Sequence, residues 1–192
     1  MRKLVVVNFM SLDGVMQSVL SADEDRDGGF ERGGWVPPYM DATVARVMSE
    51  ATTSAGALLL GRRTYELFAA TWSQADQREP AVAALNRMPK YVASRTLAKA
   101  DWHNSRVLGS DLTTELAELK SGPGADIVVF GSGGLIPTLA GAGLVDEYRL
   151  LVFPVVLGGG KRMFPAGSTP MALTLLGTET SGTGVVILTY GR

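Results

Sequence analysis

Short apolar runs, many of them rich in β-branched residues, alternate along this chain with segments of helical periodicity. The apolar runs lie at residues 4–10, 57–60, 91–93, 106–108, 127–130 and 148–156. Runs this short are typical of strands that are buried on both faces of a sheet. Strands that alternate with helices favour a mostly parallel sheet with a layer of helices on each face. The pattern therefore predicts an α/β fold.

Caps and buried faces mark the helical segments. We expect helices at residues 41–52, 64–70, 81–87, 111–120 and 135–142. Asp41 and Asp111 are suited to cap two of them, because an aspartate oxygen accepts hydrogen bonds from a free first turn. In the last quarter of the chain strand follows strand. We expect residues 172–176 and 185–190 to form an antiparallel pair at the edge of the sheet.

Composition limits the classes of function. The 192 residues are 46% hydrophobic and 19% charged, and no linker divides them, which predicts a single domain over residues 1–192. Eighteen basic residues against nineteen acidic ones leave little excess for a nucleic-acid-binding face. No apolar stretch approaches the ~18 residues of a membrane span, and the apolar run at the N-terminus is too short for a signal sequence. We expect a cytoplasmic protein without nucleic-acid or membrane partners.

The chain has no cysteine and one histidine, His103. This excludes disulfides, thiol catalysis, iron–sulfur clusters, thiolate zinc sites and any site that needs two histidines in one chain. We expect no metal site. The chemistry that remains belongs to carboxylates, hydroxyls, amides, Lys and Arg, or to a bound organic cofactor.

Three segments that directly follow strands are suited to phosphate: Gly61-Arg62-Arg63-Thr64-Tyr65, Ser94-Arg95-Thr96 and Gly131-Ser132-Gly133-Gly134. Open α/β sheets bind ligands at the carboxyl ends of their strands. Glycines let the backbone approach a ligand closely, a helix N-terminus offers free N–H groups, and guanidinium groups match phosphate oxygens. The alternatives are a tight turn, a solvated basic turn and an ordinary polar loop. The glycine spacing also differs from G-x-G-x-x-G, so a standard dinucleotide fold is not favoured.

In this order, the three segments resemble the dihydrofolate reductase fold, and above all the reductase domain of the bifunctional riboflavin-biosynthesis deaminase/reductase and its stand-alone relatives. Further matches are Met10-Ser11-Leu12-Asp13-Gly14, Pro89-Lys90-Tyr91-Val92-Ala93-Ser94, Gly143-Leu144-Val145-Asp146-Glu147 and Phe153-Pro154-Val155-Val156-Leu157-Gly158-Gly159-Gly160. The resemblance covers nearly the whole chain. It implies a three-layer sandwich in which the central sheet is mixed but mostly parallel.

The resemblance implies an NADPH-dependent reductase of a small heterocyclic substrate, similar to 5-amino-6-(5-phosphoribosylamino)uracil reductase, and a homodimer. The cofactor-binding residues that it implies are Gly61, Arg62, Arg63, Thr64, Ser94, Arg95, Gly131, Ser132, Gly133, Gly134 and Leu135. Ser94 and Arg95 would lie near the 2′-phosphate, and the others near the remaining phosphates. Lys161 and Arg162 follow three glycines. They could contact a substrate phosphate, but a solvated turn is the interpretation that we favour.

Asp13 is the carboxylate that the resemblance places beside the substrate. It would bind a sugar hydroxyl or help to deliver a proton, although Asp-Gly is also a common turn. The acidic, Gly-rich loop at residues 22–34 is the expected substrate lid, with Gly pairs as hinges. We assign Trp35 and Tyr39 to substrate binding by stacking on a heterocycle. The alternative is that Trp35 only anchors the loop to the core.

Two departures from the resemblance concern the substrate. Dihydrofolate reductases have a carboxylate on the first helix, but the family spacing leads here to Val44 and Ala45. Folate is therefore disfavoured. The deaminase half, which needs a zinc site of His and two Cys, is also missing. A lone reductase domain remains, and a nucleotide-binding module without turnover is the alternative.

Overall fold

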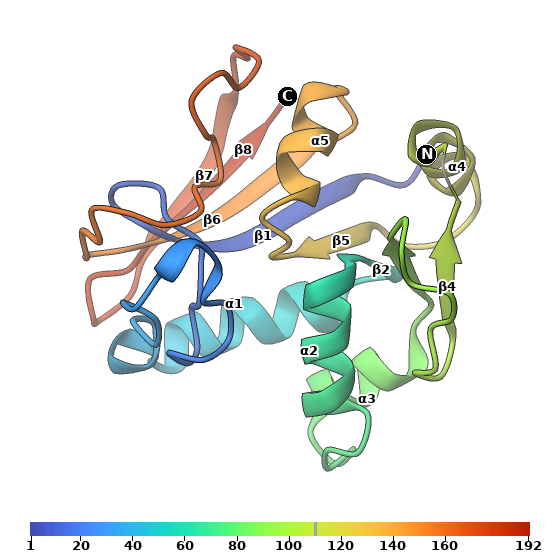
Figure 1. Cartoon of the computed structure of the whole chain (residues 1–192), viewed down its shortest axis with the longest axis horizontal. Helices are drawn as coiled ribbons and strands as arrows, with labels where there is room; N and C mark the ends of the chain where they lie inside the picture. The colour runs from blue at the N-terminus through green and yellow to red at the C-terminus, as the bar shows by residue number, and fades with distance from the viewer. Residues whose placement is uncertain (110) are drawn as a thin grey trace.

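A computed structural model describes residues 1–109 and 111–192, and its strands form one eight-stranded sheet (Figure 1). The order across the sheet is β4-β3-β2-β5-β1-β6-β8-β7. The strands are β1 (Leu4–Ser11), β2 (Ala57–Gly61), β3 (Lys90–Ala93), β4 (Ser105–Leu108), β5 (Ile127–Phe130), β6 (Glu147–Phe153), β7 (Thr174–Thr180) and β8 (Val186–Gly191). The first six strands of this order pair in parallel, and β8 is antiparallel to both of its neighbours. The prediction of a mostly parallel sheet with an antiparallel C-terminal pair is confirmed.

Helices cover both faces of the sheet. The helices are α1 (Ala42–Thr53), α2 (Arg62–Trp72), α3 (Pro80–Arg87), α4 (Leu112–Ser121) and α5 (Leu135–Gly141), with short 3-10 turns at Asp27–Gly29 and Pro37–Tyr39. In Figure 1, α1, α2 and α3 lie below the sheet and α5 lies above it. Asp41 accepts a hydrogen bond from the Val44 amide at 2.9 Å, and Asp111 accepts one from the Thr114 amide at 3.0 Å. Both act as the expected N-caps.

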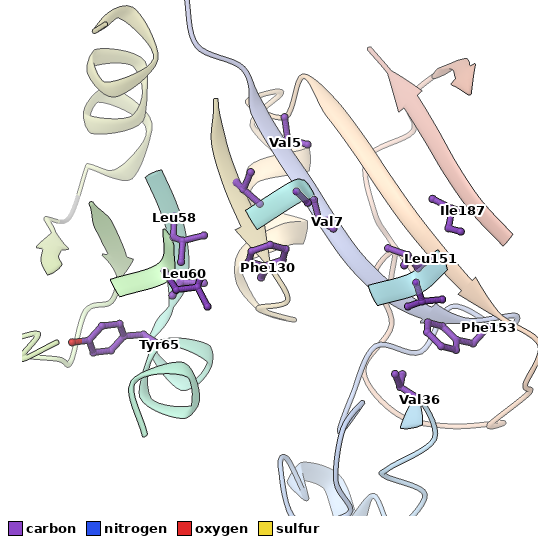
Figure 2. Close-up of a cluster of buried hydrophobic side chains, with 14 of the residues drawn as sticks. Val5, Val7, Val36, Leu58, Leu60, Tyr65, Phe130, Leu151, Phe153 and Ile187 are labelled. Atoms are coloured by element: carbon purple, nitrogen blue, oxygen red, sulfur yellow. The ribbon is translucent and has the colours of Figure 1, made fainter. Parts of the chain in front are cut away.

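The core has two layers because successive side chains of a strand point to opposite faces. Val5 and Val7 of β1 belong to a cluster that packs against α1, α2 and α3 (Figure 2). Leu4 and Val6 belong to the other cluster, which packs against α4 and α5. The strands at the centre of the sheet are buried on both faces, which explains their continuous apolar runs.

Three elements differ from the prediction by more than one residue. α2 begins at Arg62 rather than Thr64, so both arginines occupy its first turn. β6 ends at Phe153, directly before a proline that has no N–H to continue the ladder. β7 lies at residues 174–180 instead of 172–176, as an exposed edge strand that pairs only with β8 in the described part of the chain. Hydropathy does not mark such a strand, because hydrogen bonds rather than burial hold it.

No helix in residues 1–109 or 111–192 has the length and apolar character that crossing a bilayer requires.

Candidate functional site

The three segments that suit phosphate meet at one edge of the sheet. β2 lies between β3 and β5, and all three strands run in the same direction. Gly61 at the end of β2 pairs with Ala93, so Ser94 follows directly beside it. Leu59 pairs with Val129, which places Gly131 next to Gly61 on the other side. Carboxyl ends of adjacent parallel strands form the edge where α/β proteins bind ligands.

Ser132 connects two of these segments. Its Oγ accepts a hydrogen bond from the Gly61 amide at 2.8 Å and donates one to Thr64 Oγ1 at 2.9 Å. Ser132 has a φ of 74°, and Gly131 before it has a φ of 56°. A non-glycine residue in this left-handed region costs about 1–3 kcal/mol, and such residues cluster at functional sites. The Ser132 hydroxyl offsets this cost by joining the Gly-rich turn to the start of α2.

The first turn of α2 is open to a ligand. Gly61 occupies the N-cap position, and a methyl group placed on it would lie 3.1 Å from Ser132 Oγ. Among the residues that the structure describes, no side chain caps this turn. Its N–H groups carry partial positive charge and lack intrahelical partners. This end of α2 can therefore bind an anion through backbone groups.

Cationic side chains add to this edge. Arg62 forms an ion pair with Glu66 at 3.2 Å, one turn further along α2. Arg63 forms ion pairs with Asp25, at 3.4 Å, and with Asp27. Lys161 Nζ lies 2.5 Å from Asp25 Oδ2 and 2.8 Å from Asp27 Oδ2. The hydrogen bonds from Arg63 and then Lys161 lower the pKa of Asp27 to about 2.

Lys161 is a candidate site residue, and its position favours the phosphate contact over the solvated turn. A methyl group placed on Gly133 would lie 3.6 Å from Lys161 Cδ, so the lysine stem runs against the Gly-rich turn. The signal in the sequence was its place directly after three glycines near the end of β6. Two cations, Arg63 and Lys161, thus reach the same edge from different elements.

Ser94 and Arg95 lie at the end of β3. Ser94 Oγ accepts hydrogen bonds from the amides of Thr96 and Leu97 at 3.2 and 2.9 Å. Its hydroxyl hydrogen can still be donated, because a serine hydroxyl both donates and accepts. Arg95 is exposed. Both residues are therefore placed to contact an anionic group beside the start of α2.

Asp13 lies at the end of β1, and the protein itself binds both of its carboxylate oxygens. Oδ1 accepts hydrogen bonds from Ser11 Oγ at 2.7 Å and from the Leu157 amide at 3.0 Å, and Oδ2 accepts one from the Gly158 amide at 2.8 Å. The bond from the Leu157 amide and then the Ser11 hydroxyl lower the pKa of Asp13 to about 2. The group is ionised at neutral pH. It ties the start of the loop after β1 to the turn that follows β6.

Trp35 and Tyr39 lie where the loop after β1 meets the core. Trp35 is 7% exposed, and its Nε1 donates a hydrogen bond to the Gln17 carbonyl at 3.0 Å. Its ring packs edge-on against Phe153, with the centroids 5.5 Å apart. Tyr39 packs against the same Phe153 ring, with the centroids 6.1 Å apart. This geometry favours the anchoring role for Trp35 over stacking on a substrate.

The backbone of the expected lid is pinned rather than free. Gln17 Nε2 donates hydrogen bonds to the carbonyls of Asp25 and Asp27, both at 3.0 Å. Ser18 Oγ donates to the Asp25 carbonyl at 2.7 Å and accepts from its amide at 2.8 Å. A cavity of about 540 Å³ opens between residues 27–32 and 159–161. At Lys161 this cavity borders the edge of the sheet where the three phosphate-suited segments meet. It is large enough for a small heterocycle.

A family model described as "RibD C-terminal domain" matches residues 2–187. The chain belongs to the RibD C-terminal domain family. The resemblance found in the motifs is thereby confirmed. The family supports a reductase-type oxidoreductase.

Known proteins are similar to this member of the RibD C-terminal domain family in sequence or in fold. It is 34% identical over 140 residues to the uncharacterized protein YyaP of Bacillus subtilis (strain 168), covering 69% of this chain and 72% of that one. A candidate riboflavin biosynthesis protein from Shewanella sp. PV-4 matches with a TM-score of 0.68 and 19% identity, over 99% of this chain and 98% of that one. A pyrimidine reductase-like protein from Corynebacterium diphtheriae matches with a TM-score of 0.64 and 13% identity, over 99% and 91% of the two chains.

A dihydrofolate reductase from Enterococcus faecalis, complexed with NADP(H), also matches this family member. The TM-score is 0.62 at 14% identity, over 99% of this chain and 96% of that one. At this identity the likeness is one of fold. The prediction of a dihydrofolate-reductase-like sandwich is confirmed.

Proposed function

We propose that this protein is an NADPH-dependent reductase of a small heterocyclic substrate, similar to 5-amino-6-(5-phosphoribosylamino)uracil reductase. The observation that carries the proposal is the Ser132 connection, which holds the open first turn of α2 beside the Gly-rich turn. Two cations, Arg63 and Lys161, reach the same edge. This donor set fits a diphosphate, which needs backbone N–H groups and cations in one place.

The residues that hold the cofactor divide into two groups. Gly61, Arg63 and Thr64 at the start of α2, together with the turn after β5 (Gly131–Leu135), would bind its diphosphate. Ser94 and Arg95, together with Arg62, bind the 2′-phosphate that distinguishes NADPH from NADH. When bound, NADPH supplies a hydride, and the chain positions the reacting ring and excludes water.

Asp13 positions the site and does not supply a proton in this proposal. A group with a pKa of about 2 is ionised at neutral pH and has no proton to give. Its bonds to the Leu157 and Gly158 amides fix the turn that leads to the cavity. We therefore expect Asp13→Asn to lower turnover through disorder of this turn, with cofactor affinity unchanged. Unchanged turnover would remove Asp13 from the mechanism.

The substrate lies in the cavity between residues 27–32 and 159–161, and a homodimer is the expected assembly. The family relationship supports a pyrimidine or similar heterocycle as substrate. Trp35 and Tyr39 pack on Phe153 and so anchor the end of the loop after β1, whose residues 27–32 line this cavity. Sedimentation equilibrium tests the dimer. A monomer across micromolar concentrations would refute it.

The test of the proposed function is a melting curve with NADPH, followed by a turnover assay. At a ligand concentration of 100 times Kd, binding stabilises the fold by about 2.7 kcal/mol. For a domain of this size, this corresponds to a rise in Tm of about 5–10 °C. No rise with millimolar NADPH or NADP would refute the proposal. Binding without oxidation across pyrimidine, pterin and quinone substrates would favour the module without turnover.

A further inference from the structure

Two carboxylates of the loop after β1 occupy the cations of the proposed phosphate site. Lys161 Nζ lies 2.5 Å from Asp25 Oδ2 and 2.8 Å from Asp27 Oδ2. Arg63 Nη1 pairs with Asp27 Oδ2 as well, and lies 3.4 Å from Asp25 Oδ1. Each carboxylate therefore bridges the same two cations. The cluster carries two positive and two negative charges, so it presents no net charge to a ligand.

The two cations come from the elements that are expected to hold phosphate. Arg63 is the second residue of α2, in its open first turn. Lys161 lies against Gly133 of the Gly-rich turn. Carboxylate and phosphate oxygens both accept charge-assisted hydrogen bonds from guanidinium and ammonium groups. Asp25 and Asp27 thus supply, from within the chain, the kind of oxygen that a diphosphate would bring.

The loop backbone and its carboxylates are held in different ways. Gln17 and Ser18 bind the backbone of Asp25 and Asp27, and these bonds do not involve the carboxylates. The Asp27 side chain is 47% exposed and that of Asp25 is 23% exposed, and Asp25 Oδ1 also accepts a hydrogen bond from the Asp27 amide at 3.1 Å. A methyl group placed on Gly28 or Gly29 would meet nothing within 4 Å. When the carboxylates turn away from the cations, the bonds from Gln17 and Ser18 therefore still hold the loop.

We propose that Asp25 and Asp27 act as an internal anion that keeps Arg63 and Lys161 occupied, and that a diphosphate-bearing ligand binds by displacing them. This inference rests on the proposed function, because the ligand is then NADPH. It makes Lys161 a phosphate-binding residue. It also makes the site selective, because an anion of single charge competes poorly with two carboxylates that are already in place.

The experiment measures binding of inorganic pyrophosphate and of NADPH by calorimetry at low ionic strength. The variant is Asp25→Asn/Asp27→Asn, which keeps the shape of both side chains. It also keeps the Oδ1 of residue 25, which accepts a hydrogen bond from the amide of residue 27. The control is Asp23→Asn/Glu24→Gln, which makes the same change in net charge in the same loop. Asp23 pairs with Arg26, and Glu24 accepts from the Leu20 amide. None of the four ion pairs of the cluster is touched.

We expect both ligands to bind about tenfold more tightly to Asp25→Asn/Asp27→Asn, because the ion pairs no longer have to be broken. The control should stay within about twofold of the unaltered protein. Adding Lys161→Gln to the double variant should abolish most of the gain. In the unaltered protein, saturating pyrophosphate should raise the carboxyl pKa of Asp27 toward its ordinary value, as followed by NMR.

The other outcomes separate the two proposals. If the unaltered protein binds NADPH and the double variant binds it equally or more weakly, the displacement is wrong while the proposed function stands. An equal gain in the control would show a general charge effect, which also overturns the displacement. If neither protein binds NADPH or pyrophosphate, both proposals fail. A pKa of Asp27 that stays low with pyrophosphate bound would show that the carboxylate has not moved.

Discussion

Asp13 and Asp27 lie on two halves of the same edge and have the same pKa for different reasons. Each has a pKa of about 2. Asp13, at the end of β1, is held first by backbone amides and a hydroxyl, and its side chain is 17% exposed. Asp27, beside α2, is held by the side chains of Arg63 and Lys161 and is 47% exposed. We call the part of the edge around Asp13 the fixed half, because backbone groups hold its carboxylate. We call the part around Asp27 and the start of α2 the exchangeable half, because another anion can take the place of its carboxylate.

The difference lies in what must move for each carboxylate to lose its partners. The amides of Leu157 and Gly158 belong to the turn after β6, and the Leu157 side chain is buried in the core, so the backbone that holds Asp13 is fixed in place. The cations that hold Asp27 lie on flexible stems and can bind another anion instead. A low pKa therefore marks structural stability in one place and readiness for a ligand in the other.

The largest effect should come from Asp13→Ala. This change leaves the Leu157 and Gly158 amides and the Ser11 hydroxyl without their acceptor. We expect the free energy of unfolding to fall by about 2–4 kcal/mol, because hydrogen bonds to a charged group are strong and partly buried donors such as the Leu157 amide are costly to leave unpaired. Urea unfolding measures the loss. The control is Asp23→Ala, at a side chain that is 80% exposed. An equal loss of stability in the control would show that the bonds of Asp13 do not fix this part of the edge.

Acid should unfold the protein partly through Asp13. The pKa of Asp13 is about 2 in the folded protein, against an ordinary value of 3.8 for an unfolded chain. The contribution of Asp13 to the free energy of unfolding is therefore complete above about pH 4 and is lost as the pH falls through 2. The shift corresponds to about 2 kcal/mol. Stability measured between pH 5 and pH 2 should fall less steeply in Asp13→Asn than in the unaltered protein. Asp27→Asn should leave the slope unchanged in 0.5 M salt, because salt screens exposed ion pairs. If Asp27→Asn changed this slope more than Asp13→Asn does, the distinction between the two carboxylates would be wrong.

Ser132 joins the two segments of the exchangeable half, and two variants separate its hydrogen bonds from its strain. Ser132→Ala loses the bonds to the Gly61 amide and Thr64 and keeps the left-handed backbone, at a cost of about 1–2 kcal/mol. Ser132→Gly loses the same bonds but removes the strain, and should recover about 1 kcal/mol. Urea unfolding should rank the unaltered protein first, the glycine variant second and the alanine variant last. A glycine variant less stable than the alanine variant would show that strain is not stored there.

The parts of the molecule that burial and glycine determine could be predicted from the sequence. Strands such as Ile127–Phe130 are buried on both faces, and their apolar runs mark them directly. The Gly-rich turn and the Gly61-Arg62 segment could be predicted as candidate phosphate sites because each follows a strand that is buried on both faces. The edge strand β7 was misplaced, because an exposed strand has no burial pattern to read.

Contacts between segments far apart in the sequence could not be predicted. Lys161 lies 134 residues from Asp27, and no local pattern connects them. The same holds for Asp13 and the Leu157 amide, which are 144 residues apart. The residue types at the site were therefore predictable, whereas the partner of each charge was set by the topology of the sheet.

The smallest effect concerns selectivity between NADPH and NADH. Arg62 and Arg95 lie in the exchangeable half, and both side chains are exposed. The ion pair of Arg62 with Glu66 is also at the surface, so we expect the loss of either arginine to leave the free energy of unfolding unchanged. We expect Arg62→Ala and Arg95→Ala each to weaken NADPH about fivefold and to leave NADH unchanged, because an exposed charge pair contributes about 1 kcal/mol. Fluorescence titration with both cofactors measures the ratio, with Arg78→Ala in the loop after α2 as control. An equal loss for both cofactors would assign these arginines to the diphosphate and not to the 2′-phosphate.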